Sequence, residues 1–148
     1  MKRIACLLAT LLIGAACFGQ TENKENAQNA GLRVVARINL LDQTRPIPSV
    51  NIYTPDADGV FRITMVSNCT IGNDRGGSWS GWVTWTNELG ISVPVEIAHL
   101  KADVSGVGTQ FPLTFNAAKD TPIMFSITSF GTLGGSHYNA YVILEQLE

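Results

Sequence analysis

The 148-residue sequence predicts an all-β fold, an antiparallel β-sandwich of jelly-roll type with about eight strands. Short runs rich in β-branched and aromatic residues alternate with clusters of Gly, Pro, Asn and Asp. No 3.6-residue apolar pattern extends beyond the N-terminal segment, so no further helix is expected. Hydrophobic residues make up 45% of the chain and charged residues 15%, which is enough apolar surface for one core.

Residues 1–19 have the layout of a signal peptide. Lys2 and Arg3 precede an apolar run over residues 4–16, and small residues follow it. The run is short for a transmembrane helix, which needs about 20 residues. We therefore expect an exported protein, secreted or held in the cell envelope, with no membrane span.

Two processing routes remain open for this segment. Cleavage after Gly19 would leave Gln20 as the new N-terminus, and it is the favoured route. In the alternative, Cys17 becomes the lipidated first residue of a lipoprotein. Against that alternative, Gly14 occupies the position three residues before the cysteine, where a lipobox usually has Leu, Val or Ile.

The mature chain divides into a polar, Asn-rich tether over residues 20–31 and a β-sandwich domain over residues 32–148. Loss of Lys2 and Arg3 leaves eight basic and twelve acidic residues, a net charge of −4. The basic residues are scattered, so a nucleic-acid partner is not expected. Cys69 remains as the one cysteine, either as a buried thiol, which is favoured, or as a bridge between subunits.

Each strand is predicted from residues that alternate between two faces. In residues 32–41, Leu32, Val34, Ala36, Ile38 and Leu40 share the face expected to be buried. Further strands are expected over residues 50–54, 60–68, 79–87, 91–100, 110–117, 122–130 and 138–147.

Several of these strands have side chains expected to point inward together, and turns or a proline are expected to interrupt the strands. Phe61, Ile63 and Met65 share one side, as do Phe111, Leu113 and Phe115, and as do Ile123, Phe125 and Ile127. A turn is expected over residues 55–59 and a hairpin connection over residues 88–90. Pro94 indicates a sheet edge or a bulge.

The order of these motifs resembles tumour-necrosis-factor-like jelly rolls, including complement globular heads, over most of the mature chain. Residues 52–64, IYTPDADGVFRIT, match an extended strand, a Pro/Gly turn and a strand in which Gly59, Phe61 and Arg62 are the matching positions. Residues 85–90, 121–127 and 138–147 follow in the same order. The chain departs from the family in having Phe61 where Tyr is usual and no collagen-like stalk.

This resemblance implies a homotrimer, in which aromatic and apolar side chains meet around a threefold axis. Phe130, Tyr138 and Tyr141 are the candidates for such a seam, because the later strands have more apolar residues than one core needs.

Trp79, Trp82 and Trp85 are candidate ligand-contact residues, since aromatic rings on a sandwich face can stack against sugar rings. On a strand, their spacing puts Trp79 and Trp85 on one face and Trp82 on the other. They form a single platform only if a bulge intervenes. Core packing is therefore favoured for at least one face.

No catalytic residue, cofactor or metal site is predicted. Residues 77–81 fit the pattern Gly-x-Ser-x-Gly, but no helix follows them as a nucleophile elbow requires. Asp56 and Asp58 lack the further oxygen ligands of a calcium loop and fit a turn, although a calcium site involving Asp74 stays open.

Three functional interpretations follow. The first is a non-enzymatic, exported jelly-roll domain that assembles with copies of itself and binds a protein or glycan, or has a structural role. The second is a carbohydrate-binding module that uses exposed tryptophan. The third is a small hydrolase, which would need His99 or His137 close to a serine.

Overall fold

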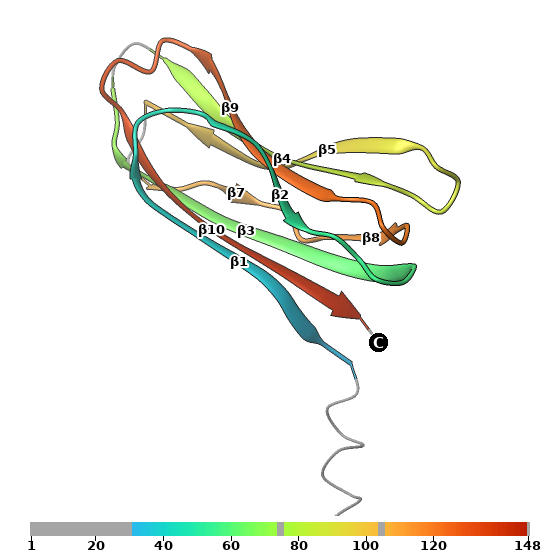
Figure 1. Cartoon of the computed structure of the whole chain (residues 1–148). Helices are drawn as coiled ribbons and strands as arrows, with labels where there is room; N and C mark the ends of the chain where they lie inside the picture. The colour runs from blue at the N-terminus through green and yellow to red at the C-terminus, as the bar shows by residue number, and fades with distance from the viewer. Residues whose placement is uncertain (1–30, 74–75, 104–105, 148) are drawn as a thin grey trace, which may run out of the picture. The chain divides into compact units, whose positions relative to one another are not determined.

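The computed structural model describes residues 31–73, 76–103 and 106–147, and within them it consists of strands and their connections. The strands form two antiparallel sheets that stack face to face (Figure 1). Their bounds are β1 Arg33–Gln43, β2 Ile47–Tyr53, β3 Gly59–Ile71, β4 Gly77–Thr86, β5 Ser92–Lys101, β6 Gly106–Val107, β7 Thr109–Gln110, β8 Leu113–Ala117, β9 Ile123–Gly131 and β10 His137–Leu147.

The pairing of the eight longer strands is that of a jelly roll. β1 pairs with β10, β2 with β9, β3 with β8, and β4 with β5, as in one long hairpin that has been rolled up. The chain consequently crosses between the sheets at every connection of these strands except the β4–β5 hairpin. One sheet contains β1, β10, β3, β8 and the two-residue β6, and the other contains β2, β9, β4, β5 and the two-residue β7. The predicted fold class is confirmed.

The core lies between the sheets and is filled by alternate residues of each strand. Phe61, Ile63 and Met65 of β3 are buried on one side, as predicted. Ile123, Phe125 and Ile127 of β9 are buried from the other sheet, also as predicted. Because the two inner faces interdigitate, the sequence alternation directly marks the core.

The start of β1 does not follow the predicted face. Leu32 and Val34 are exposed, whereas Val35 packs against the core together with Ala36. The β1–β10 register shifts between Val34 and Ala36, which indicates a β-bulge. The extra residue reverses the alternation, so the predicted inward set applies only from Ala36 onwards.

Phe111 also departs from the prediction. Its side chain is 54% exposed, while Leu113 and Phe115 pack inward from β8. The predicted single strand is broken at residues 111–112, where Pro112 has no backbone N–H for a ladder. The sequence alternation therefore cannot be extended back from β8 through the proline.

Tyr138 belongs to the core and not to an exposed seam. It is 1% exposed, and its ring centroid lies 4.8 Å from that of Trp79. Its hydroxyl donates a hydrogen bond to the carbonyl oxygen of Arg45 at 2.9 Å. Of the three residues predicted for a threefold seam, only Phe130 and Tyr141 remain exposed.

Within the described residues, no helix has the length and apolar character needed to cross a membrane. The predicted signal peptide, the tether up to residue 30 and Cys17 lie outside the described residues.

Candidate functional site at the outer face of β4

The outer face of the second sheet carries polar and aromatic side chains in three cross-strand rows. Ser78, Ser80 and Trp82 lie on β4, where the inward positions are taken by Trp79, Gly81 and Val83. Their neighbours on β5 and β9 are fixed by the strand register. The rows are Glu96–Trp82–Ser126, His99–Ser80–Thr128 and Lys101–Ser78–Phe130. We call this surface the β4 face.

The three tryptophans are divided between the two sides of β4. Trp79 and Trp85 are 2% and 7% exposed, and the Trp85 ring centroid lies 4.3 Å from that of Phe115. Trp79 is enclosed by the core, whereas Trp85 forms part of the wall of a hollow of about 490 Å³ beside the β4–β5 hairpin. Trp82 is half-buried and lies on the β4 face, so it is the most accessible of the three.

A bulge does occur beside these residues, but it lies in β5. The β4–β5 register shifts between Gly81 and Trp82, where Ile97 is the unpaired residue and is buried next to Ala98. The β4–β9 register runs without a shift through the same positions. The alternation along β4 is therefore intact.

The indole of Trp82 is held in place by a neighbouring strand. Its Nε1–H donates a hydrogen bond to Oγ1 of Thr128 on β9, at 3.0 Å. This bond directs the indole from β4 towards β9 and limits its rotation. A fixed, half-exposed aromatic ring loses little conformational entropy when a ligand stacks on it.

Ser80 and His99 of the middle row form a connected polar cluster with Glu96 of the neighbouring row. His99 Nδ1 lies 3.0 Å from Glu96 Oε1 and 3.3 Å from Ser80 Oγ. The pKa of Glu96 lies below its usual value, chiefly because the Ser80 hydroxyl donates to the carboxylate and also because of His99, while partial burial opposes the shift. Glu96 is therefore an anion that orients both neighbours, and both contacts of His99 use Nδ1.

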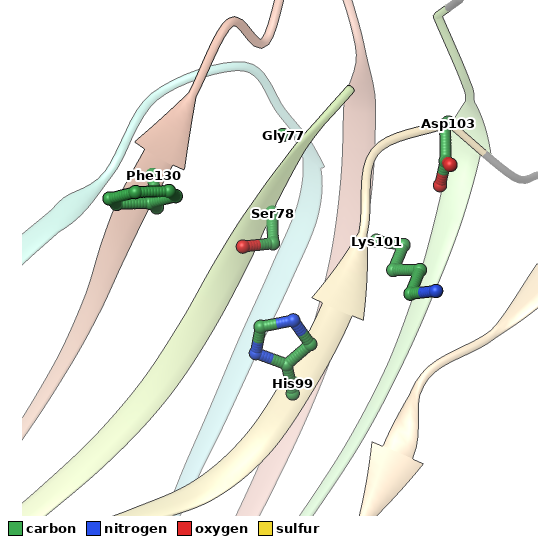
Figure 2. Close-up of a pocket in the computed structure, with 6 residues that line it drawn as sticks. All are labelled: Gly77, Ser78, His99, Lys101, Asp103 and Phe130. Atoms are coloured by element: carbon green, nitrogen blue, oxygen red, sulfur yellow. The ribbon is translucent and has the colours of Figure 1, made fainter.

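A hollow of about 260 Å³ opens at the end of the β4 face. It is lined by Gly77, Ser78, His99, Lys101, Asp103 and Phe130 (Figure 2). Figure 2 shows Ser78 in the middle, with the Phe130 ring on one side and His99 on the other. The hollow thus joins one aromatic ring to hydroxyl, imidazole, amine and carboxylate groups.

The arrangement of Ser80, His99 and Glu96 differs from a hydrolytic triad. In a triad the acid contacts one imidazole nitrogen and the serine contacts the other, so that the ring can pass a proton. Here both contacts are at Nδ1. Residues 77–81 are moreover part of β4 and not a strand-to-helix turn. The other histidine, His137, contacts Asp42 through Nδ1 at 2.6 Å.

The aspartates and the cysteine considered from the sequence do not form a site among the described residues. Asp58 accepts a hydrogen bond from the backbone N–H of Lys119 at 2.7 Å, within the expected turn. No group of three or more His, Cys, Asp or Glu side chains that could hold a metal is found among the described residues, and Asp74 lies outside them. Cys69 is buried, and burial raises the pKa of its thiol.

The neighbours of Trp82 on β5 and β9 are not predicted from the sequence. Only the β5 neighbour could have been inferred, from the hairpin turn, which Asn87 closes because its Oδ1 accepts hydrogen bonds from the N–H groups of Leu89 and Ile91. Counting back from such a turn pairs Trp82 with the region of Glu96. Nothing local in the sequence indicates that β9 supplies Thr128 and Phe130.

Comparisons with known proteins give a likeness in fold alone. No protein-family model matches the sequence, and no curated protein matches it significantly. Over 80% of its length the chain is similar to part of endo-1,4-β-D-xylanase 10B of Clostridium thermocellum, in a structure of its CBM22-1 and GH10 modules with xylohexaose, at 11% identity and a TM-score of 0.42.

Two structures of infectious bursal disease virus are similar over 77% of this chain. They are the VP2 subviral particle, at 10% identity and a TM-score of 0.39, and the Gx strain, at 10% identity and a TM-score of 0.40. The chain spans 26% of the xylanase chain and 31% of each viral chain. The resemblance to tumour-necrosis-factor-like proteins stays a prediction beyond the jelly-roll fold itself.

Proposed function

We propose that this protein is an exported, non-enzymatic jelly-roll domain that binds carbohydrate through the β4 face. The observation that carries the proposal is the fixed indole of Trp82, which lies half-exposed beside a row of hydroxyl, imidazole and carboxylate groups. An aromatic ring offers a face to the C–H side of a sugar, and the polar groups offer partners to its hydroxyls.

Glycan-array binding by the purified protein, followed by calorimetry with a soluble hit, tests this proposal. Trp82→Ala removes the stacking surface and is expected to reduce affinity at least about tenfold. Phe111→Ala is the matched control, because Phe111 is an exposed aromatic residue that belongs neither to the β4 face nor to the apolar surface of the first sheet. Equal affinity of the Trp82 variant and the wild-type protein would refute binding at this face.

The absence of catalysis is part of the proposal. It is supported by the Nδ1 contacts of His99 and by the position of Ser80, which is half-buried within a strand. We expect the oligosaccharides that bind to be recovered intact after prolonged incubation. Shortened products that appear with wild-type protein and disappear with Ser80→Ala would contradict a non-enzymatic role.

Export is proposed from the signal-peptide pattern of residues 1–19. Mass spectrometry of the mature protein is expected to give Gln20 as the first residue. A diacylglyceryl group on Cys17 would instead establish the lipoprotein route.

Self-association is the second candidate function, and a different surface favours it. The outer face of the first sheet exposes Val66, Tyr141 and Ile143 side by side, since Val66 pairs with Tyr141 and Ile143 lies two residues further along β10. Contiguous exposed apolar side chains are typical of contact surfaces between proteins. We propose that copies of the chain meet here, as a homotrimer.

Light scattering of the purified protein tests the assembly. A trimer is expected for the wild-type protein, and Ile143→Lys, which adds a charge to the apolar surface, is expected to give a monomer. Trp82→Ala should leave the mass unchanged. A wild-type monomer at micromolar concentration would refute this second candidate without affecting carbohydrate binding.

A further inference from the structure

Phe130 is an aromatic residue on the β4 face that the core does not use. Its side chain is 82% exposed at the end of β9, and it lies across from Ser78 on β4. Such exposure of a large aromatic ring has a transfer cost in water that a stacking ligand would remove. Figure 2 shows its ring at the border of the hollow that Ser78 and His99 also line.

Trp82 and Phe130 lie on the same face but at opposite ends of it. Their rows are four β4 residues apart, since Trp82 is level with Ser126 and Ser78 is level with Phe130, which corresponds to about 13 Å along the strand. The Trp82 indole leans towards Thr128, which is two residues before Phe130 and so about 7 Å from it. By either measure, the distance from Trp82 to Phe130 is longer than one sugar ring.

The surface between the two aromatic residues carries polar groups. Ser80 and His99 lie in the middle row. Both contacts of His99 use Nδ1, so Nε2 is left without a protein partner among the described residues and can bond to a hydroxyl group of a ligand. Ser78 contributes a hydroxyl, and Lys101 lines the hollow without an ion pair among the described residues. Aromatic, polar and aromatic groups thus follow one another along β4.

We infer that the β4 face binds an extended linear oligosaccharide that lies along β4, with one sugar ring on Trp82 and another on Phe130. This inference rests on the proposed carbohydrate-binding function and specifies its ligand class. A single sugar cannot contact both rings. A chain of linked sugars presents hydroxyls between its stacked ends, where Ser80 and the Nε2 of His99 can bond to them.

The test is a length series measured by calorimetry with the purified protein. The probes are oligosaccharides of two to six residues built from β-1,4-linked glucose, xylose, mannose or N-acetylglucosamine. For a backbone that binds, affinity is expected to rise at least about tenfold between the disaccharide and the hexasaccharide, because only the longer chain reaches Phe130. Phe130→Ala is expected to abolish this gain and to leave disaccharide affinity within about twofold of wild type.

Control variants separate the two aromatic positions. Trp82→Ala should weaken binding at every length, whereas Phe111→Ala, an exposed aromatic residue outside the hollow, should change neither the affinity nor its length dependence. Thermal unfolding of Phe130→Ala should match wild type, since this ring is exposed and packs little.

The outcomes distinguish failure of the inference from failure of the proposed function. Binding that depends on Trp82 but does not grow with length, or a wild-type length dependence in Phe130→Ala, would overturn the extended site and leave the proposed function standing. If no backbone of any length binds with a dependence on Trp82, the carbohydrate function and the extended site are both refuted.

Discussion

Replacing Trp79 and Trp82 by alanine, one at a time, should have very different effects on stability, although the two residues lie three positions apart on β4. Trp79 is 2% exposed and contacts Tyr138, so its truncation removes a large buried ring and leaves a cavity. The expected cost is about 3–5 kcal/mol. Truncation of Trp82 loses one solvent-accessible hydrogen bond and part of a half-buried surface, which together should cost about 1–2 kcal/mol.

Trp79→Phe refines this comparison. Nε1 of Trp79 is buried without a hydrogen-bond partner among the described residues, so phenylalanine removes an unsatisfied polar group while it keeps an aromatic ring. It should therefore cost clearly less than Trp79→Ala.

Urea unfolding followed by far-ultraviolet circular dichroism measures all three variants. The midpoint should fall strongly for Trp79→Ala and slightly for Trp82→Ala, with similar slopes. Equal losses at the two positions, or a larger loss for Trp82, would refute the assignment of the two faces of β4.

Further predictions concern the core. Burial raises the pKa of Tyr138 to about 12, above its ordinary value of 10.0, so the unfolded chain ionises first and stability is retained below about pH 10. Between about pH 10 and 12, urea unfolding in a Cys69→Ala background should lose up to roughly 1.4 kcal/mol per pH unit from this group. Ser67→Ala should be neutral or stabilise by up to about 1 kcal/mol, since Oγ of Ser67 is buried without a partner among the described residues. Gly108→Ala should destabilise by about 1–3 kcal/mol, because its Cβ would lie 2.6 Å from that Oγ, and Ser67→Ala should relieve part of this loss.

A specific experimental result would contradict each of these predictions. Tyr138→Phe should flatten the alkaline profile, and an unchanged slope in that variant would assign the pH dependence to another group. A loss above about 1 kcal/mol for Ser67→Ala would mean that its hydroxyl has a bonding partner. Strictly additive effects in the Ser67, Gly108 double variant would contradict their close approach.

The fold could be predicted from the sequence wherever alternation ran unbroken. Ile123, Phe125 and Ile127 were placed correctly because period two is a direct consequence of the pleat. Val34 was misplaced because a bulge is not encoded in the hydrophobic pattern, and Phe111 because it lies with Pro112 in the break between β7 and β8.

The candidate site could be predicted only in part. The separation of Trp82 from Trp79 and Trp85 follows from their spacing within one strand. Thr128 and Phe130 reach the same face through pairing of β4 with β9, which are separated by more than 35 residues in sequence. Such long-range register depends on how the whole sheet assembles, and no local pattern specifies it.

The claim that a sugar chain docks on the β4 face is tested most directly by nuclear magnetic resonance of the three indole N–H signals during titration with a hexasaccharide that binds. The Trp82 signal, assigned by its loss in Trp82→Phe, should shift progressively, while those of the buried Trp79 and Trp85 stay in place. A titration in which the Trp82 signal does not move, although the sugar binds, would contradict the claim.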